Sequence, residues 1–242
     1  MPVVERRRSR GRSYLLLARV SNLPTVWSNV LAGLVAGGAA FPFSPSSDDT
    51  ALGALLLSIS CSYTGGMFLN DAFDAPLDRA ARPERPIPRG DVGPGEAFAI
   101  GGALLAAGVA LVWPYRTALV CAAALAAAIV AYDWTHKRSP VAPIVMGACR
   151  GLVYLTAAAT AALSAAAWVG AGVMLVYVAG LTVVARRAGA NARWLIPALI
   201  AGISLVDAVF ILAIRPSAFG LALVAALGCP LTLSLQRWVP GD

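Results

Sequence analysis

The sequence is poor in charge and in the residues that build metal or redox sites in soluble proteins. Only 13% of its 242 residues are charged, there is a single histidine, and Lys137 is the only lysine. The four cysteines stand far apart within apolar stretches, which excludes the close spacing of metal-binding or redox cysteines. With 59% hydrophobic residues and a mean hydropathy of +0.74, the composition is that of an integral membrane protein.

Apolar runs long enough to cross a bilayer recur along the chain. A membrane-spanning helix needs roughly 20 apolar residues, and breaks containing proline and arginine separate eight such runs. We predict an all-α membrane protein in which residues 1–12 form a basic cytoplasmic arm and residues 13–242 form one transmembrane domain. The eight predicted spans are residues 14–40, 51–75, 94–113, 116–133, 141–163, 166–185, 193–214 and 216–236.

The distribution of basic residues predicts the orientation of these helices, because lysine and arginine are enriched in cytoplasmic loops. A cytoplasmic N-terminus puts 17 of the 19 basic residues on the cytoplasmic side and leaves only Arg116 and Arg215 opposite. Both termini are then cytoplasmic. We expect a bacterial plasma membrane protein whose active site faces the cytoplasm. This topology accounts for the net charge of +7 without a nucleic-acid partner.

Residues 70–89 concentrate polar side chains at the end of an apolar run. Asn70, Asp74 and Asp78 are spaced four apart, so on a continuous helix they share one face. Magnesium is usually held by one or two carboxylates and completed by water and phosphate oxygens. These three side chains are therefore candidate ligands for Mg2+ that carries a diphosphate. A solvated helix end is the alternative interpretation, and Pro76 should end or kink the helix inside the cluster.

Other polar residues could complete a site for the same anion. Asp71 belongs to the acidic cluster, and Arg82 and Arg85 offer direct positive charge just after it. The first span also carries a polar stripe, with residues three and four apart that must face a cavity or partner helices. Either these side chains bond to neighbouring helices, or the first two line a pocket beside the acidic cluster. The stripe consists of Arg19, Asn22, Thr25 and Asn29.

A second polar group stands at the end of the fourth predicted span. Lys137 can contact a phosphate oxygen, and Tyr132 can face a pocket just above it. His136, a lone histidine beside two cations, is more typical of an interfacial side chain than of a metal ligand or base. Arg150 and Asp207 lie within later spans, where a charged residue either contacts substrate or makes a structural polar contact.

The pattern Asn70-Asp71-x-x-Asp74-x-x-x-Asp78, with the Arg-Pro pairs that follow it, resembles the first aspartate-rich motif of the UbiA superfamily of intramembrane prenyltransferases. The segment from Tyr132 to Lys137 is similar to that family's tyrosine-and-lysine motif, with the lysine one position late. The resemblance implies two four-helix halves around a lipid-open cavity.

What the resemblance implies for the chemistry is transfer of an isoprenyl group. Mg2+ on Asn70, Asp74 and Asp78 would hold the diphosphate of a polyprenyl diphosphate donor in the bilayer, and Lys137 would assist. Tyr132 would lie beside the allylic carbon, and a small acceptor would capture the allylic cation. Asp74 and Asp78 are thus expected to be both metal ligands and catalytic residues.

One departure from the family pattern leaves alternatives open. Residues 179–191, where the second aspartate-rich motif is expected, contain no carboxylate. Arg186 and Arg187 could hold phosphate oxygens there without metal. Alternatively, the chain is a UbiA-like terpene cyclase, or a non-catalytic protein, similar to EboC-like proteins, that binds or moves a lipid or metabolite.

Overall fold

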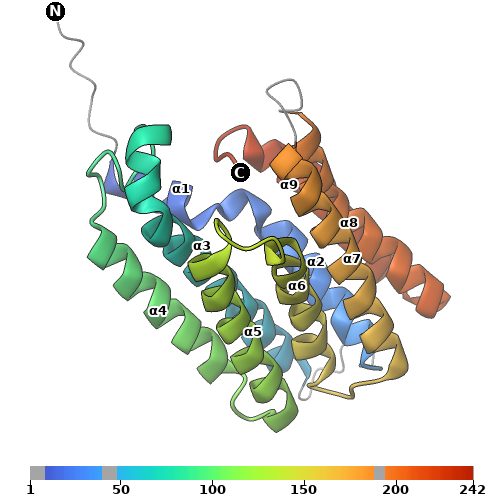
Figure 1. Cartoon of the computed structure of the whole chain (residues 1–242). Helices are drawn as coiled ribbons and strands as arrows, with labels where there is room; N and C mark the ends of the chain where they lie inside the picture. Colours follow the sequence, from blue (N-terminus) through green and yellow to red (C-terminus); the bar gives the residue numbers. More distant parts are fainter. Residues whose placement is uncertain (1–8, 40–47, 188–193, 242) are drawn as a thin grey trace, which may run out of the picture.

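The computed structural model describes residues 9–39, 48–187 and 194–241, and every regular element within these ranges is helical (Figure 1). This confirms the predicted all-α class. Two short 3-10 helices, η1 (Val20–Asn22) and η3 (Pro216–Ala218), precede α2 and α9. The longer helices are α1 (Arg10–Ala18), α2 (Leu23–Ala36), α3 (Asp48–Ala81), α4 (Pro94–Leu111), α5 (Arg116–Thr135), α6 (Ala142–Ala158), α7 (Ala165–Arg187), α8 (Leu195–Ile214) and α9 (Phe219–Gln236).

Six helical segments in the described ranges are long and apolar enough to cross a bilayer. They are α3 from Leu52 onward, α4, α5, α7, α8 and the continuous η3 and α9. The remaining two candidates are shorter, since α6 has 17 residues and α2 has 14. The chain is therefore an integral membrane protein, and the count of eight spans stays a prediction.

The first predicted span does not form a single helix, because the chain turns at Arg19. This residue has φ 43° and ψ 48°, the left-handed region that non-glycine residues rarely adopt. Its N–H bonds to the carbonyl of Leu16 at 3.2 Å, and its carbonyl accepts from the Tyr63 hydroxyl of α3 at 3.5 Å. Pro24 stands in the first turn of α2, where a missing N–H removes no helical bond. The predicted span is thus divided into α1, beside α3, and α2, inside the bundle.

Of the two outcomes expected at Pro76, an end of the helix is wrong, because α3 continues through this residue to Ala81, and a kink stays a prediction. Proline removes one N–H donor, and the helical pattern resumes beyond it, with the N–H of Arg82 bonded to the Asp78 carbonyl at 2.8 Å. The continuous helix keeps the whole acidic cluster on one element.

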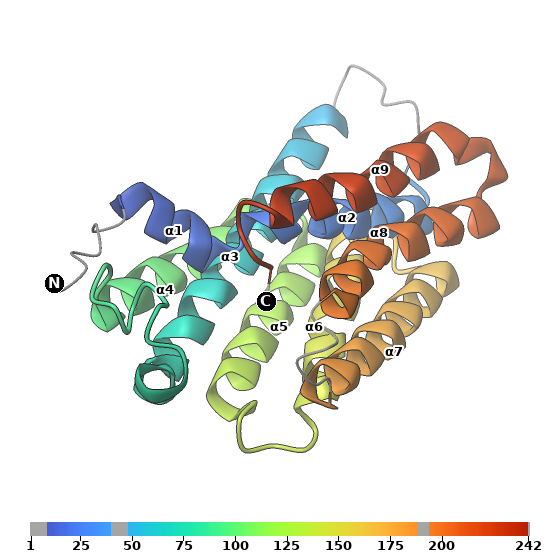
Figure 2. The ribbon, with the colours of Figure 1, turned by 90° about the horizontal axis from the view of Figure 1, so that it is seen from above.

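Helix α2 lies at the centre of the bundle (Figure 2). It contacts α3 on one side and α6, α8 and α9 on the other. A Cβ atom on Gly33 would lie 2.7 Å from the carbonyl oxygen of Tyr154, and one on Gly37 would lie 2.6 Å from that of Ala158. Small residues at such positions let membrane helices approach closely. The close contact fixes α2 against α6.

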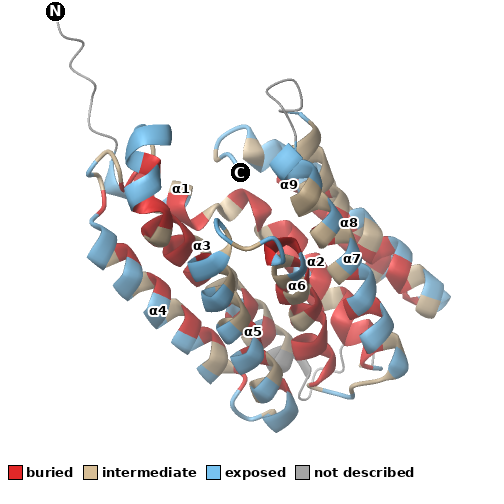
Figure 3. Cartoon of the chain, in the orientation of Figure 1, coloured by how far each residue is buried: buried red, intermediate tan, exposed pale blue. Residues whose placement is uncertain are grey.

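The helices form two groups that share α2. Helices α3, α4 and α5 pack on one another, and α6 to α9 pack in sequence order. Side chains of α2 belong to the buried core of both groups, and the buried faces point inward along the bundle (Figure 3). Helix α2 therefore joins the two groups of helices.

Candidate functional site

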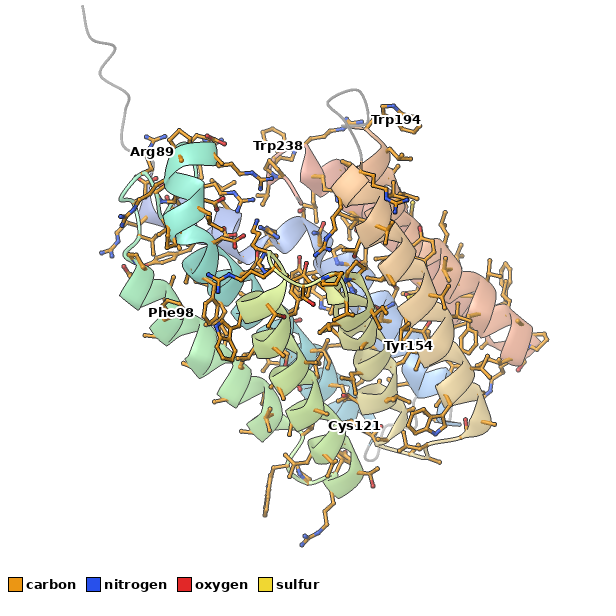
Figure 4. The ribbon with its side chains drawn as sticks, viewed as in Figure 1. Arg89, Phe98, Cys121, Tyr154, Trp194 and Trp238 are labelled. Carbon is orange, nitrogen blue, oxygen red and sulfur yellow. The ribbon has the colours of Figure 1, made fainter. Side chains whose placement is uncertain are left out.

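The candidate residues gather at one end of the bundle, where α3, α5, α7 and α9 end. Arg89, Trp194 and Trp238 lie at this end, and Cys121 lies towards the opposite one (Figure 4). Two cavities are present here. The inner cavity, about 190 Å³, lies within the bundle, and the outer cavity, about 680 Å³, lies between α1, the end of α3 and the segment after α9.

The inner cavity combines an apolar wall with a few polar groups. Its apolar side chains come from α2, α3, α5, α6, α7 and α8. An apolar chamber with few polar groups is the usual form of a site for an amphiphilic small molecule. The charged and aromatic polar residues that line it are Arg19, Tyr63, Tyr132, Asp133 and Arg150.

Two arginines neutralise the outer side of the acidic cluster. Arg19 and Arg85 both donate to one oxygen of Asp71, at 3.0 and 3.2 Å. Arg85 also donates to Asp78 at 2.8 Å. Both carboxylates are buried, and buried carboxylates are costly unless paired in this way. The pairs tie the loop after α3, and the turn at Arg19, to the end of α3.

Asp74 faces the opposite way, towards α5. Its two carboxylate oxygens lie 3.0 Å from Lys137 Nζ and 3.4 Å from His136 Nε2. The structure thus joins the acidic cluster to the lysine of the second polar group. His136 departs from the interfacial role favoured for it, because its side chain is only 10% exposed and lies against a buried carboxylate.

Asn70 and Asp133 form a buried pair beside this contact. Asn70 Nδ2 donates to Asp133 Oδ1 at 3.1 Å, while Asp133 Oδ2 has no partner among the described residues. Asp133 is 4% exposed and lines the inner cavity. A buried oxygen without a partner is unusual and indicates a place for a donor or cation. Sequence analysis missed Asp133, although a carboxylate inside an apolar span is itself a functional signal.

Tyr132 and His136 stack on each other, with ring centroids 5.0 Å apart and planes inclined by 18°. Tyr132 lines the inner cavity, in agreement with the predicted pocket-facing position. The carbonyl of His136 accepts from Arg186 at 2.7 Å. Arg186 therefore ties the end of α7 to the end of α5. Arg187 is exposed, and residues 188–191 of the expected second motif lie outside the described residues.

Arg150 and Asp207 are linked through Asn29. Arg150 donates to Asn29 Oδ1 at 2.8 Å, and Asn29 Nδ2 donates to Asp207 Oδ2 at 2.7 Å. Asp207 is fully buried, and it also accepts from Ser28 at 2.6 Å and from the hydroxyl of Tyr154. Asp207 therefore makes a structural contact among α2, α6 and α8. Arg150 lies at the cavity wall, with its guanidinium over the Tyr63 ring.

The side chain of Asn22 forms hydrogen bonds with the end of α9 and the segment that follows it. Asn22 donates to the carbonyl of Gly241 at 2.9 Å and accepts from Gln236 at 3.0 Å. A Cβ on Gly241 would lie 2.5 Å from Asn22 Oδ1, so a larger residue at this position would displace the Asn22 side chain. Figure 2 shows the C-terminus over the centre of the bundle. Arg82, the last of the predicted residues, is exposed and lines the outer cavity.

The side chains around Asp133, which lines the inner cavity, fit Mg2+ by their chemistry. Asn70, Asp74 and Asp133 offer oxygen ligands, and Asp133 Oδ2, which has no partner in the described ranges, is a buried oxygen that a cation would satisfy. Asp78 bonds to Arg85 instead. In the described ranges, no three or more histidine, cysteine or acidic side chains are already grouped as a metal site. Binding a metal therefore requires Asp74 to exchange a cationic partner for it.

The chain is similar to a known protein family and to several of its members. The model of the UbiA prenyltransferase family matches residues 23–241. A digeranylgeranylglyceryl phosphate synthase of Halobacterium salinarum is 35% identical over 182 residues, 73% of this chain and 61% of that protein. Its counterpart from Methanopyrus kandleri is 34% identical over 137 residues, 56% of this chain and 48% of that protein. The matched region thus spans about half to three-fifths of these relatives.

A further relative has a different name. Protoheme IX farnesyltransferase of Granulibacter bethesdensis is 35% identical over 144 residues, 57% of this chain and 42% of that protein.

A structure described for digeranylgeranylglyceryl phosphate synthase in membranes superposes with a TM-score of 0.63 at 19% identity, covering 93% of this chain and 96% of that one. A UbiA homologue of Archaeoglobus fulgidus, solved with GPP and Mg2+, gives 0.58 at 15% identity, covering 93% and 86%. These structures share the fold. With the family model matching nearly the whole described chain, the protein belongs to the UbiA prenyltransferase family.

Proposed function

We propose that this chain transfers an isoprenyl group from an isoprenyl diphosphate to a small acceptor within the bilayer. The observation that carries the proposal is the contact of Asp74 with Lys137 beside the apolar inner cavity. It brings the acidic cluster of α3 together with a cation that lies directly after α5, next to a chamber suited to an isoprenyl chain. The relatives named above are transferases, which favours transfer over cyclisation or lipid transport.

The apolar wall of the inner cavity would hold the isoprenyl tail and exclude water from the reacting carbon. The diphosphate would then lie at the polar end, where Lys137 can donate to its oxygens once released from Asp74. Positive charge placed where the leaving diphosphate develops negative charge lowers the barrier to bond cleavage. Arg186 supports this arrangement by holding the end of α5 through the His136 carbonyl.

Asn70, Asp74 and Asp133 would hold Mg2+, which supplies further charge stabilisation of the diphosphate. This set differs from the predicted one in using Asp133 in place of Asp78, which pairs with Arg85. The ring of Tyr132 faces the cavity and offers its π electrons to an allylic cation. The basic end of the bundle would face the cytoplasm. Relatives from archaea and a bacterium leave the predicted bacterial membrane as an expectation.

The test is binding of geranyl diphosphate to the purified full chain in detergent, measured by calorimetry with Mg2+ or with EDTA. We expect binding that requires Mg2+ and is lost in Asp74→Ala. Asp91→Ala is the matched control, because Asp91 is a carboxylate near the same end that pairs with Arg89 and lines neither cavity. Equal binding by Asp74→Ala and the original chain would refute the proposal.

A further inference from the structure

The residues that follow α9, Arg237 to Gly241, fold back over the start of α2, and we call them the C-terminal strap (Figure 2). One side chain holds both ends of this fold. Asn22 Nδ2 donates to the Gly241 carbonyl at 2.9 Å, and Asn22 Oδ1 accepts from Gln236 Nε2 at 3.0 Å. The amide of Asn22 thus bonds to the last residue of α9 and to the far end of the strap, which closes the segment into a loop.

The strap contributes to the walls of both cavities. Gly241 lines the inner cavity together with Asn22, and Trp238 and Pro240 line the outer one. Trp238 lies at the end of the bundle where the candidate residues gather (Figure 4). Displacement of the strap would therefore remove Gly241 from the wall of the inner cavity, next to the solution at this end.

Few contacts hold the strap in place. Among the residues that the structure describes, the bond from Asn22 to Gly241 is the only hydrogen bond that joins residues 239–241 to an element other than α9. Pro240 has no N–H to donate, and Trp238 is 80% exposed. A segment with few buried contacts and few hydrogen bonds opens at a low cost in free energy.

The closed position of the strap also leaves buried polar atoms unpaired. Ser21 directly precedes Asn22, and its hydroxyl oxygen is buried without a partner in the described ranges. The same holds for Gln236 Oε1, on the side chain that bonds to Asn22. A buried oxygen without a partner loses the hydrogen bonds that water would give it. Water that enters when the strap opens can bond to Gln236 Oε1, which offsets part of the cost of opening.

We propose that the C-terminal strap is a gate that closes the inner cavity on the side of the solution and opens when a polar ligand enters or leaves. In the closed position the chain's own groups occupy Asn22, which belongs to the polar stripe expected to line a binding pocket. A ligand that needs both amide groups of Asn22 must displace Gly241 and Gln236. The movement of the strap does not depend on the proposed transfer reaction, so the two proposals can fail separately.

The first experiment uses Cys149, which lines the inner cavity and is 8% exposed, as a reporter of the gate. In the purified full chain in detergent, with the other three cysteines changed to alanine, a charged, water-soluble methanethiosulfonate modifies Cys149 at a measured rate. The test variant is Gly241→Val, whose Cβ would lie 2.5 Å from Asn22 Oδ1 and 2.9 Å from Gln236 Nε2 and so pushes the strap away. Gly220→Val, at the other end of α9, is the matched control, because no atom lies within 4 Å of its Cβ.

We expect Gly241→Val to raise the modification rate of Cys149 about tenfold or more, and Gly220→Val to leave it within about twofold. A chain that keeps only Cys121, towards the opposite end of the bundle, should react equally fast with and without Gly241→Val, which excludes a general loosening of the fold (Figure 4). Equal rates for Cys149 in the two glycine variants, or an effect of the same size at Cys121, would overturn the gate.

The second experiment locks the strap with a disulfide. Asn22→Cys with Gly241→Cys, in a chain whose four native cysteines are alanine, places two thiols at the contact that holds the strap. The rates of binding and release of geranyl diphosphate with Mg2+ are compared between the oxidised and reduced forms of the same protein. We expect oxidation to slow both rates about tenfold and a reductant to restore them. Because both forms carry the same substitutions, loss of the Asn22 amide cannot cause the difference.

The outcomes separate the gate from the proposed function. Unchanged rates after oxidation, with the disulfide verified by mass spectrometry, would mean that ligands reach the inner cavity by another route and would overturn the gate. If geranyl diphosphate does not bind but Gly241→Val still speeds modification of Cys149, the proposed function fails and the gate stands. If an isoprenyl group is transferred but Cys149 reacts equally in Gly241→Val and Gly220→Val, the gate fails and the proposed function stands. Where the disulfide does not form, the modification rates of Cys149 decide alone.

Discussion

Lys137 lies 3.0 Å from Asp74, so the only lysine of the chain bonds to the central carboxylate of the acidic cluster. We predict that Lys137→Met slows release of diphosphate from an isoprenyl diphosphate about a hundredfold, because a positioned cation at the leaving group is lost. Arg138→Gln removes one neighbouring positive charge and should leave the rate unchanged. The measurement is kcat from released diphosphate at saturating donor. Equal rates in Lys137→Met and Arg138→Gln would contradict the role of Lys137.

Asp133 Oδ2 has no partner among the residues that the structure describes, which predicts that Asp133 helps Mg2+ to bind with the isoprenyl diphosphate. Asp133→Asn keeps the size of the side chain and removes its negative charge. We expect it to raise the Mg2+ concentration needed for half-maximal binding of geranyl diphosphate about tenfold. A Mg2+ titration at fixed donor concentration measures this. An unchanged midpoint would exclude Asp133 from the magnesium site.

The hydroxyl of Tyr154 donates to Asp207 in the buried network of α2, α6 and α8. We predict that Tyr154→Phe lowers the free energy of unfolding by about 1 to 3 kcal/mol, because a buried carboxylate loses a donor. Tyr115→Phe is the matched control, since no hydrogen bond from the Tyr115 hydroxyl is made within the described residues, and it should have little effect. Unfolding titrations in SDS compare the two variants. Equal stability would show that the network adds nothing.

The close contact between α2 and α6 predicts the effect of one methyl group. In Gly33→Ala the added Cβ would meet the Tyr154 carbonyl at 2.7 Å, so we expect a loss of about 1 to 3 kcal/mol in unfolding free energy. In Gly172→Ala, on α7, no atom lies within 4 Å of the new Cβ, and stability should stay the same or rise slightly. SDS unfolding titrations of both variants measure the difference. If both variants lost the same stability, the effect would not come from this contact.

The helices could be predicted from the sequence because a bilayer leaves the backbone no partners except its own. Long apolar runs therefore had to be helical, and α3 to α9 follow the predicted spans closely. The turn at Arg19 could not be predicted in this way. It depends on Tyr63 and Asp71, which lie on another helix and which no local pattern connects to Arg19.

The acidic cluster could also be predicted only in part. Spacing predicted that Asn70, Asp74 and Asp78 share a helix face, and they do lie along α3. The partner of each side chain depends on what packs against that face, which is α5 for Asn70, the residues directly after α5 for Asp74 and the loop after α3 for Asp78. The sequence could name the charged residues, but only the packing of α3 could assign them their partners.

The contact between Asn22 and Gly241 has a practical consequence for work with this protein. Because Gly241 lines the inner cavity and Trp238 the outer one, a peptide fused to the C-terminus would extend a segment that lines both cavities. A C-terminal affinity tag would then compete with ligands for the same space. Proteins prepared with tags at opposite ends should differ in ligand affinity, and removing a C-terminal tag should restore it.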